Sequence, residues 1–139
     1  MRFMMLMYPR PEAELETSTP ADMDPALVNA MVAFNQQLVD LGIMKGGEGD
    51  DTLIWNNGDG SDIMDGDGGA DTVQVNGSTT AGDNFTIAPN GSRVRFDRVN
   101  LGLFNLDILA EALVINGGDG DEQITGTVGL APLILMTYN

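Results

Sequence analysis

Four copies of a glycine-rich nonapeptide set the strongest limit on how this chain can fold. Three are nearly contiguous, GGEGDDTLI (46–54), NGDGSDIMD (57–65) and GDGGADTVQ (66–74), and the fourth is GGDGDEQIT (117–125). Glycine readily adopts the backbone conformations of tight turns, so each copy predicts a turn that aims backbone carbonyls at one point. The acid in the sixth position adds a charged oxygen. Because calcium binds about six to eight oxygen ligands, such turns suit this hard cation.

Each turn is followed by an apolar residue two positions after the acid. These residues are Leu53, Met64, Val73 and Ile124. Each is expected to point inward from a short strand, because alternate side chains of a strand lie on one face. Turn and strand therefore alternate along the chain, which predicts a mainly β fold.

The copies fit the pattern G-G-x-G-x-D-x-U-x and resemble the calcium-binding repeats of RTX, or hemolysin-type, proteins. The resemblance covers 46–125 and extends at most to 139. It implies a short right-handed parallel β-roll, a β-solenoid in which two repeats make one coil and calcium lies between stacked turns. RTX-like proteins are commonly secreted, so the resemblance also implies an extracellular location.

On that geometry the turn at 46–51 lies over the turn at 66–71. Asp51 and Asp71 are the expected carboxylate ligands, with backbone carbonyls around Gly47, Gly49, Asp67 and Gly69. Trp55 and Asn56 stand between the first two copies, so the two acids are 20 positions apart instead of the 18 of two repeats. We expect a bulge to absorb the excess.

The remaining copies predict less complete sites. Asp62 has half a site, because Thr80 stands where its partner is expected. The fourth copy offers Asp119 and Glu122, with no following repeat to cover them. We therefore expect one calcium site, or two, and not a long series.

Charge and missing residue types exclude several functions. The net charge is −15, which attracts divalent cations and repels nucleic acid and anionic membranes. Residues 46–83 hold nine acids and no Lys or Arg, so their neutralising charge has to come from outside the segment. The absence of Cys and His excludes zinc–thiolate sites and Ser-His-Asp catalysis. Neither an EF-hand nor a phosphate-binding loop fits the spacing, and the sequence predicts no enzyme.

The first 45 residues have a different character. The apolar run at 2–8 has strand length and is too short for a membrane span or a standard signal peptide. A helix is expected from Asp24, a good N-cap, through Pro25 at its first position to Gly42. Its apolar stripe, expected to be buried, consists of Leu27, Met31, Phe34, Leu38 and Leu41.

MRFMMLMY, MVAFNQQLVDLGIM and the following GGEG resemble the start of the YCII-related, or DGPF-domain, family. That resemblance implies the first strand and helix of a ferredoxin-like fold that often forms dimers. We predict an N-terminal segment, 1–45, whose strand and helix cap the β-roll of 46–139. The alternative is a cytoplasmic dimeric interaction module with a passive acidic tail. The family's activity is not expected, because its later elements and its histidine are missing.

The region between the repeats predicts further strands. Phe85, Ile87, Val94 and Phe96 alternate with polar residues around Asn90-Gly91, a strong hairpin signal. Arg93 and Arg95 are expected on the opposite, solvated face, and Arg98 past the strand end. The run LDILAEALVING could be a helix or a further coil, and the coil is favoured.

The closing LAPLILMTYN is either a last strand or an edge that seeks a partner. Self-association could therefore use this edge or the N-terminal segment. Together the patterns predict a non-enzymatic calcium-binding protein that folds when calcium neutralises its stacked acids. An acidic Gly/Asp-rich linker that stays disordered is the main alternative for the repeats.

Overall fold

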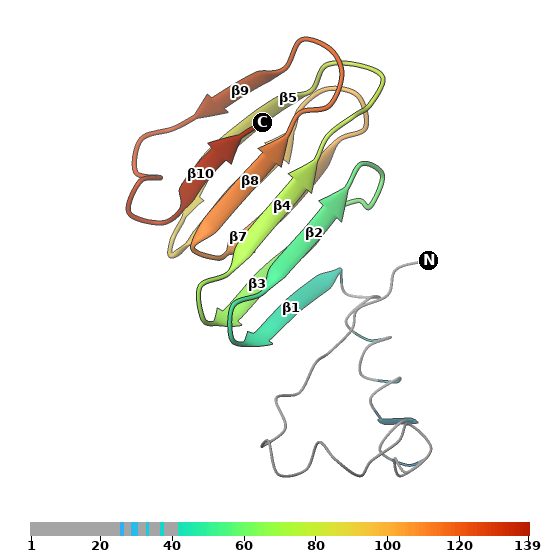
Figure 1. Ribbon diagram of the computed structural model, residues 1–139. Coiled ribbons are helices and arrows are strands. Elements are labelled where there is room, and N and C mark those ends of the chain that lie inside the picture. The colour runs from blue at the N-terminus through green and yellow to red at the C-terminus, as the bar shows by residue number, and fades with distance from the viewer. Residues whose placement is uncertain (1–25, 27–28, 31–32, 34–36, 38–41) are drawn as a thin grey trace. The chain divides into compact units, whose positions relative to one another are not determined.

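The computed structural model describes residues 26, 29, 30, 33, 37 and 42–139 of a chain that divides into two units, Met1–Leu41 and Gly42–Asn139 (Figure 1). In the first unit the five described residues are helical and exposed. The strand expected at 2–8, the apolar helix stripe and their capping role lie outside the described residues. Gly42 has a φ of 62°, the left-handed conformation typical of a residue just past a helix. No helix among the described residues has both the length and the apolar character needed to cross a bilayer.

Residues 42–139 fold into ten short strands, as the alternation of turn and apolar residue predicts. The strands are β1 Ile43–Glu48, β2 Thr52–Asn56, β3 Asp62–Gly68, β4 Thr72–Asn76, β5 Asn84–Asn90, β6 Arg93–Arg98, β7 Phe104–Leu109, β8 Ala112–Asn116, β9 Gln123–Gly126 and β10 Leu135–Tyr138.

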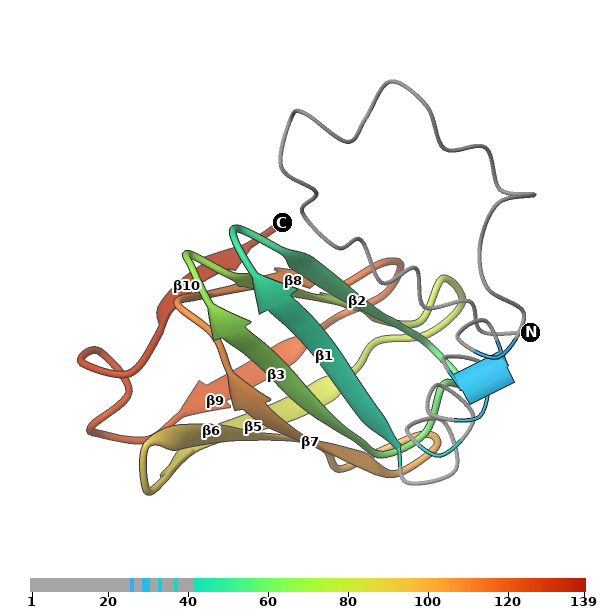
Figure 2. The ribbon, with the colours of Figure 1, turned by 90° about the horizontal axis from the view of Figure 1, so that it is seen from below.

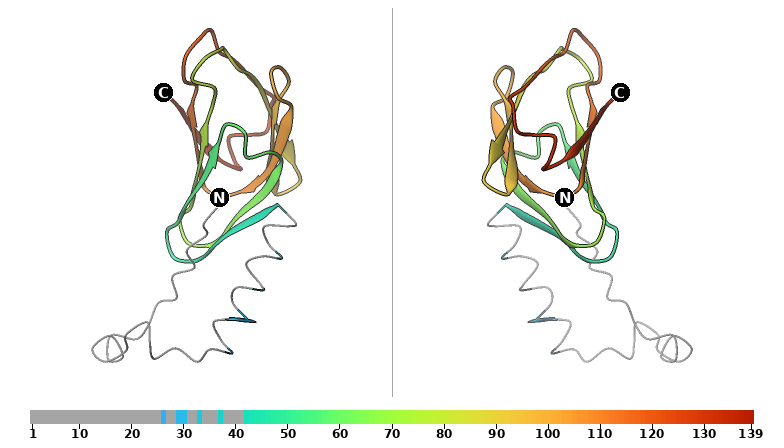
Figure 3. Two further views of the ribbon diagram at one scale, coloured as in Figure 1. Left: turned by 90° about the vertical axis from the view of Figure 1, so that its right-hand side faces the viewer. Right: turned by 90° about the vertical axis from the view of Figure 1, so that its left-hand side faces the viewer.

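The strands form two sheets that face each other. One sheet has the order β1-β3-β7-β6-β5-β9, and the other has the order β10-β8-β4-β2 (Figure 1). The chain passes back and forth between them, as Figures 2 and 3 show from two directions. Strands from successive passages pair in parallel, β1 with β3 in one sheet and β2 with β4 and β8 in the other. One passage through both sheets is called a coil below.

The first coil is 20 residues long in both sheets. Ile43 pairs with Ile63, and Thr52 pairs with Thr72. The predicted bulge is wrong, because β2 pairs with β4 without interruption as far as Asn56 and Asn76. Trp55-Asn56 lengthens β2, and Val75-Asn76 lengthens β4 by the same amount. The extra pair of residues is therefore part of the strand register and does not disturb it.

Alternating side chains from both sheets fill the space between them. The buried apolar residues are Leu53, Trp55, Met64, Val73, Val75, Phe85, Ile87, Val94, Phe96, Phe104, Leu106, Ile108, Ala110, Leu113, Ile115, Leu130 and Ile134. This confirms the inward positions predicted for Leu53, Met64 and Val73. Ile124 pairs with the buried Phe85 and so lies on the inner face, but it is 37% exposed on β9, the last strand of its sheet.

Trp55 anchors an aromatic cluster in this core. Its ring stacks on Phe104 with centroids 3.9 Å apart, and its indole nitrogen donates to the Gly60 carbonyl at 2.8 Å. Phe85 and Phe96 belong to the same cluster, and their ring centroids lie 4.8 Å apart. A residue that interrupts the repeat pattern in the sequence is thus the largest side chain of the core.

An antiparallel excursion, β5–β6–β7, lies between the parallel coils. Asn90 pairs with Arg93 across the two-residue loop Gly91-Ser92, and Gly91 has the positive φ of 68° that such a hairpin needs at its first position. This confirms the predicted hairpin. Arg93 lies on the outer face and pairs with Asp65 at 3.0 Å and Asp107 at 3.2 Å. The run 106–117 continues as β7 and β8, so the coil prediction is confirmed and the helix is not formed.

The prediction for Arg98 is wrong. Arg98 is the last residue of β6, keeps the inward alternation and is only 6% exposed. Its guanidinium contacts the fully buried Asp83 carboxylate at 3.0 Å and lies 4.9 Å from the Phe104 ring centroid. It also donates to the Gly102 carbonyl at 2.7 Å and to Asn57 Oδ1 at 2.8 Å. The buried Asp83 carboxylate offsets the cost of burying the Arg98 charge, and the alternation of residues in the strand gives no sign of this partner.

A row of asparagines joins four strands on the outer face of the smaller sheet. Asn76 donates to Asn56 at 2.8 Å, Asn116 to Asn76 at 2.7 Å, and Asn139 to Asn116 at 3.0 Å. A shift of one strand by one residue would turn its asparagine to the other face and break the row. The row therefore helps to fix the register.

Because Arg98 and Asp83 are buried together, removing one leaves an uncompensated charge. We expect Arg98→Met to lower the free energy of unfolding by about 3–5 kcal/mol. The matched variant Arg95→Met, which breaks the partly exposed pair with Asp97, should lower it by about 0–1 kcal/mol. Urea unfolding followed by circular dichroism measures both, and equal losses would contradict a structural role for the buried pair.

Candidate metal centre

The turns at 46–51 and 66–71 are stacked one coil apart, as the sequence predicts. Gly47 lies opposite Asp67 in the β1–β3 pairing. The Gly49 amide donates to the Gly68 carbonyl at 2.6 Å, and the Thr72 amide donates to the Asp51 carbonyl at 2.8 Å. Backbone hydrogen bonds therefore hold the two turns in register along their whole length.

The sixth-position acids form a ladder between coils. The Asp51 amide donates to Asp71 Oδ1 at 2.9 Å, and the Asp71 amide donates to Glu111 Oε2 at 2.8 Å. Asp50 joins the same stack by accepting from the Ala70 amide at 2.8 Å. The carboxylates of Asp71, Glu111 and Asp50 thus each accept from an amide of the neighbouring coil, and one oxygen of Asp71 is already used by this contact.

Asp51 Oδ2 is buried and has no hydrogen-bond partner. It lies over the α-carbon of Gly46, where a Cβ would come within 2.8 Å of it and within 2.5 Å of the Gly66 carbonyl oxygen. The Asp51 carboxylate and the Gly66 carbonyl thus both lie against the Gly46 backbone, and only glycine lets them come so close. A buried carboxylate oxygen without a donor is costly, and a cation would satisfy it.

The other expected ligands of this centre surround the same turns. Gly47 and Gly49 have φ values of 115° and 108°, and Gly69 lies so close to the Gly49 carbonyl that a Cβ there would collide with it. Asp67 has a φ of 72° and meets Lys45 at 3.4 Å in an exposed pair, so its side chain already has a cation. The structure therefore brings these six predicted residues together.

Asp62, Asp119 and Glu122 lie at the opposite edge of the sheets, apart from that centre. Asp62 begins β3 and is 6% exposed, and its register partner is Leu106 of β7. The position of Thr80, where the repeat pattern places the missing partner of Asp62, belongs to a turn that leads into β5, and β7 and β6 separate β5 from β3. The antiparallel excursion therefore moves that turn two strands along the sheet.

The turn at 77–83 instead stacks on the fourth copy. The Asp119 amide donates to the Ser78 carbonyl at 3.1 Å, and the Gln123 amide donates to the Asp83 carbonyl at 2.8 Å. The fourth copy is therefore stacked on an earlier turn, a contact that the repeat pattern does not predict. Asp83 takes the place of the sixth-position acid and accepts from the Ser78 amide at 2.7 Å. Sequence reasoning missed Asp83, although Gly77, which begins this turn, was a usable signal.

Glu122 resembles Asp51 in this second stack. Its Oε1 is buried without a hydrogen-bond partner, and its Oε2 accepts from the Tyr138 hydroxyl at 3.3 Å. Desolvation and the Glu122 carboxylate raise the pKa of Tyr138 above its ordinary value. Arg98 already neutralises Asp83 here, so this stack has less need of a bound cation than the first.

Charge pairing in residues 46–83 is more complete than their composition indicates. Lys45, Arg93 and Arg98, all outside the segment, pair with Asp67, Asp65 and Asp83. These contacts supply part of the outside charge that the sequence requires. The ladder acids Asp51 and Asp71 have no ion pair among the described residues.

The centre relies on few side chains. Among the described residues, no group of three or more His, Cys, Asp or Glu side chains could hold a metal ion. A cation between the two turns would therefore depend on one or two carboxylates and on backbone carbonyls. Glu111, the third acid of the ladder, was missed because its short turn contains no glycine.

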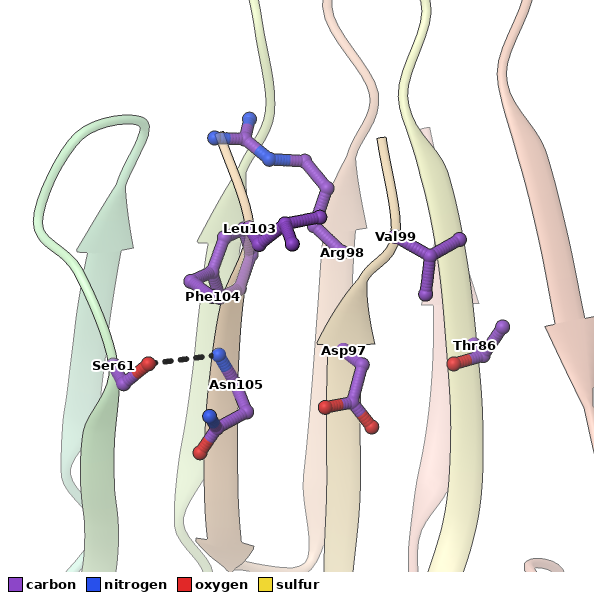
Figure 4. Close-up of a pocket in the computed structure, with 8 residues that line it drawn as sticks. All are labelled: Ser61, Thr86, Asp97, Arg98, Val99, Leu103, Phe104 and Asn105. Atoms are coloured by element: carbon purple, nitrogen blue, oxygen red, sulfur yellow. Dashed lines mark hydrogen bonds between the residues drawn. The ribbon is translucent and has the colours of Figure 1, made fainter. Parts of the chain in front are cut away.

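An open pocket lies elsewhere, beside the β6–β7 loop (Figure 4). Its lining includes exposed Leu103 and Val99, and Ser61 accepts there from the Asn105 amide at 3.0 Å. Asp97 is its one acidic lining residue, and Arg95 already binds that side chain at 2.8 Å. The pocket therefore offers no second metal centre.

Comparison with known proteins adds no relative to this picture. No protein-family model matches the chain, and no curated protein and no solved structure matches it. The interpretation of the centre thus depends on its own residues.

Close stacking of the turns predicts a contrast between two glycines. Gly69 and Gly49 both have a left-handed φ, so alanine strains both backbones, but only at Gly69 would it strike the facing carbonyl. We expect Gly69→Ala to lower the free energy of unfolding by about 1–3 kcal/mol more than Gly49→Ala. Chemical denaturation measures the difference, and similar losses would show that the turns are not in contact.

Proposed function

We propose that this protein binds calcium without catalysing a reaction, and that its coils form a short right-handed parallel β-roll around the ion. The observation that carries the proposal is the buried, unpartnered Asp51 Oδ2, which faces the Gly66 carbonyl between two stacked glycine turns. Asp71 and the carbonyls around Gly47, Gly49, Asp67 and Gly69 would complete the oxygen shell.

Charge supports the same proposal. Residues 42–139 hold 15 Asp and Glu against four Lys and Arg. All four of these cations form ion pairs. The ladder acids stack on one edge without such a partner, so a bound divalent ion would relieve their repulsion. Its binding free energy then becomes folding free energy.

The type of site favours calcium over other ions. Backbone carbonyls and carboxylates suit the large, irregular shell of calcium, whereas magnesium prefers a tight octahedron and its own water. A site with one or two carboxylates should be weak, with a Kd of about 0.1–1 mM. That range suits extracellular calcium, and we propose a secreted location on this ground.

Calcium should increase order in this chain. We expect millimolar calcium to increase the β signal in circular dichroism and to raise the Tm relative to excess chelator, with magnesium giving a much smaller change. The physical reason is that the ion binds only where the turns are stacked. Identical spectra and melting curves with chelator and with calcium would contradict calcium-linked folding.

A direct test of the centre uses two variants with the same change in charge. We expect Asp51→Asn to weaken calcium binding at least about tenfold, or about 1.4 kcal/mol, because it removes the negative charge of the carboxylate that would bind the ion. Asp121→Asn, on the exposed part of the fourth copy, should leave the affinity nearly unchanged. Isothermal calorimetry measures both, and equal effects would indicate diffuse attraction instead of a site.

A further inference from the structure

The two strands that end the sheets, β9 and β10, differ from the strands before them. Strands β2 to β8 alternate buried and less buried residues, whereas all four residues of β9 and all four of β10 are exposed. In the part of the chain that the structure describes, each has a neighbour on one side only. Both sheets therefore end in an open edge at the same end of the stack.

The core continues to this end and is only partly covered there. Leu130 and Ile134, in the connection between β9 and β10, are buried in it.

Three inward positions of the last strands are nevertheless exposed. Met136 pairs with Leu113, and Tyr138 pairs with Ile115, so both point toward the core side of their sheet. Yet Met136 is 40% and Tyr138 54% exposed, while their partners are almost fully buried. In the facing sheet Ile124 pairs with Phe85 in the same way and is 37% exposed. The apolar rows of both sheets are thus incompletely covered at this end.

This end also lacks charge. Residues 123–139 contain no Asp, Glu, Lys or Arg, in a chain whose net charge is −15. Edge strands are commonly protected from pairing by lysines, prolines or bulges, and β10 has none of these. Glu122 contacts Tyr138 of β10, but the strand itself carries no charge that would repel a second acidic copy.

We propose that a second copy of this chain covers this end, with β10 pairing antiparallel to the β10 of its partner about a two-fold axis. A two-fold axis perpendicular to the sheet keeps Met136 and Tyr138 of both copies on the same face, so the apolar residues of one copy continue those of the other. The two four-stranded sheets become one sheet of eight strands. Such a contact uses the same surface twice and closes, so the assembly stops at a dimer.

The test is sedimentation equilibrium of the full chain in saturating calcium, over a concentration range from micromolar to hundreds of micromolar. We expect a reversible dimer that Leu135→Lys weakens at least about tenfold, because each copy would bring a lysine into the short strand pair, and lysine on an edge strand opposes such pairing. Leu103→Lys is the matched control, because Leu103 is 75% and Leu135 72% exposed, and it should dimerise normally. Circular dichroism checks that both variants are folded.

A second measurement identifies the contact directly. The chain has no cysteine, so a single Thr137→Cys should be linked between copies by a short bifunctional maleimide, and Leu103→Cys should not. A monomer at every concentration, an open-ended polymer, or a dimer that Leu135→Lys leaves intact would each overturn the proposal. None of these results depends on where calcium binds.

Discussion

Parallel pairing of strands from successive coils is the constraint on which the rest of this structure depends. In the first coil the 20-residue offset is the same in both sheets and places the turn at 66–71 directly against the turn at 46–51. In this register the Asp51 amide reaches the Asp71 carboxylate. The candidate metal centre is thus a product of strand register more than of any single side chain.

The antiparallel excursion shows how the protein uses an interruption. By placing three strands between β3 and β9, it moves the turn at 77–83 away from Asp62 and onto the fourth repeat. Arg98, at the end of β6 in the middle of the excursion, then neutralises Asp83 within that displaced turn. The stack at 77–83 and 117–122 therefore has an internal cation, whereas Asp51 and Asp71 in the first stack have no ion pair among the described residues.

Local patterns in the sequence predict most of the strands and the hairpin, because glycine, alternation and Asn-Gly act over a few residues. The stacking of the first turns is instead what the resemblance to RTX repeats implies. Arg98, Asp83 and Glu111 escaped because their roles depend on contacts between distant residues, as in the pair of Asp71 with Glu111. Trp55 was read as an insertion because nothing in its neighbourhood shows that β4 carries a matching extension.

The asparagine row has a chemical consequence as well as a structural one. Asn76 and Asn116 each precede glycine, the sequence in which a side-chain amide is most easily lost through attack by the next backbone nitrogen. In the fold those nitrogens, of Gly77 and Gly117, donate to carbonyls of the neighbouring coil at 2.8 and 3.3 Å. Both reacting groups are held by separate hydrogen bonds. Stacking of the coils thereby protects Asn76 and Asn116 from deamidation, and these are asparagines that help to fix the strand register.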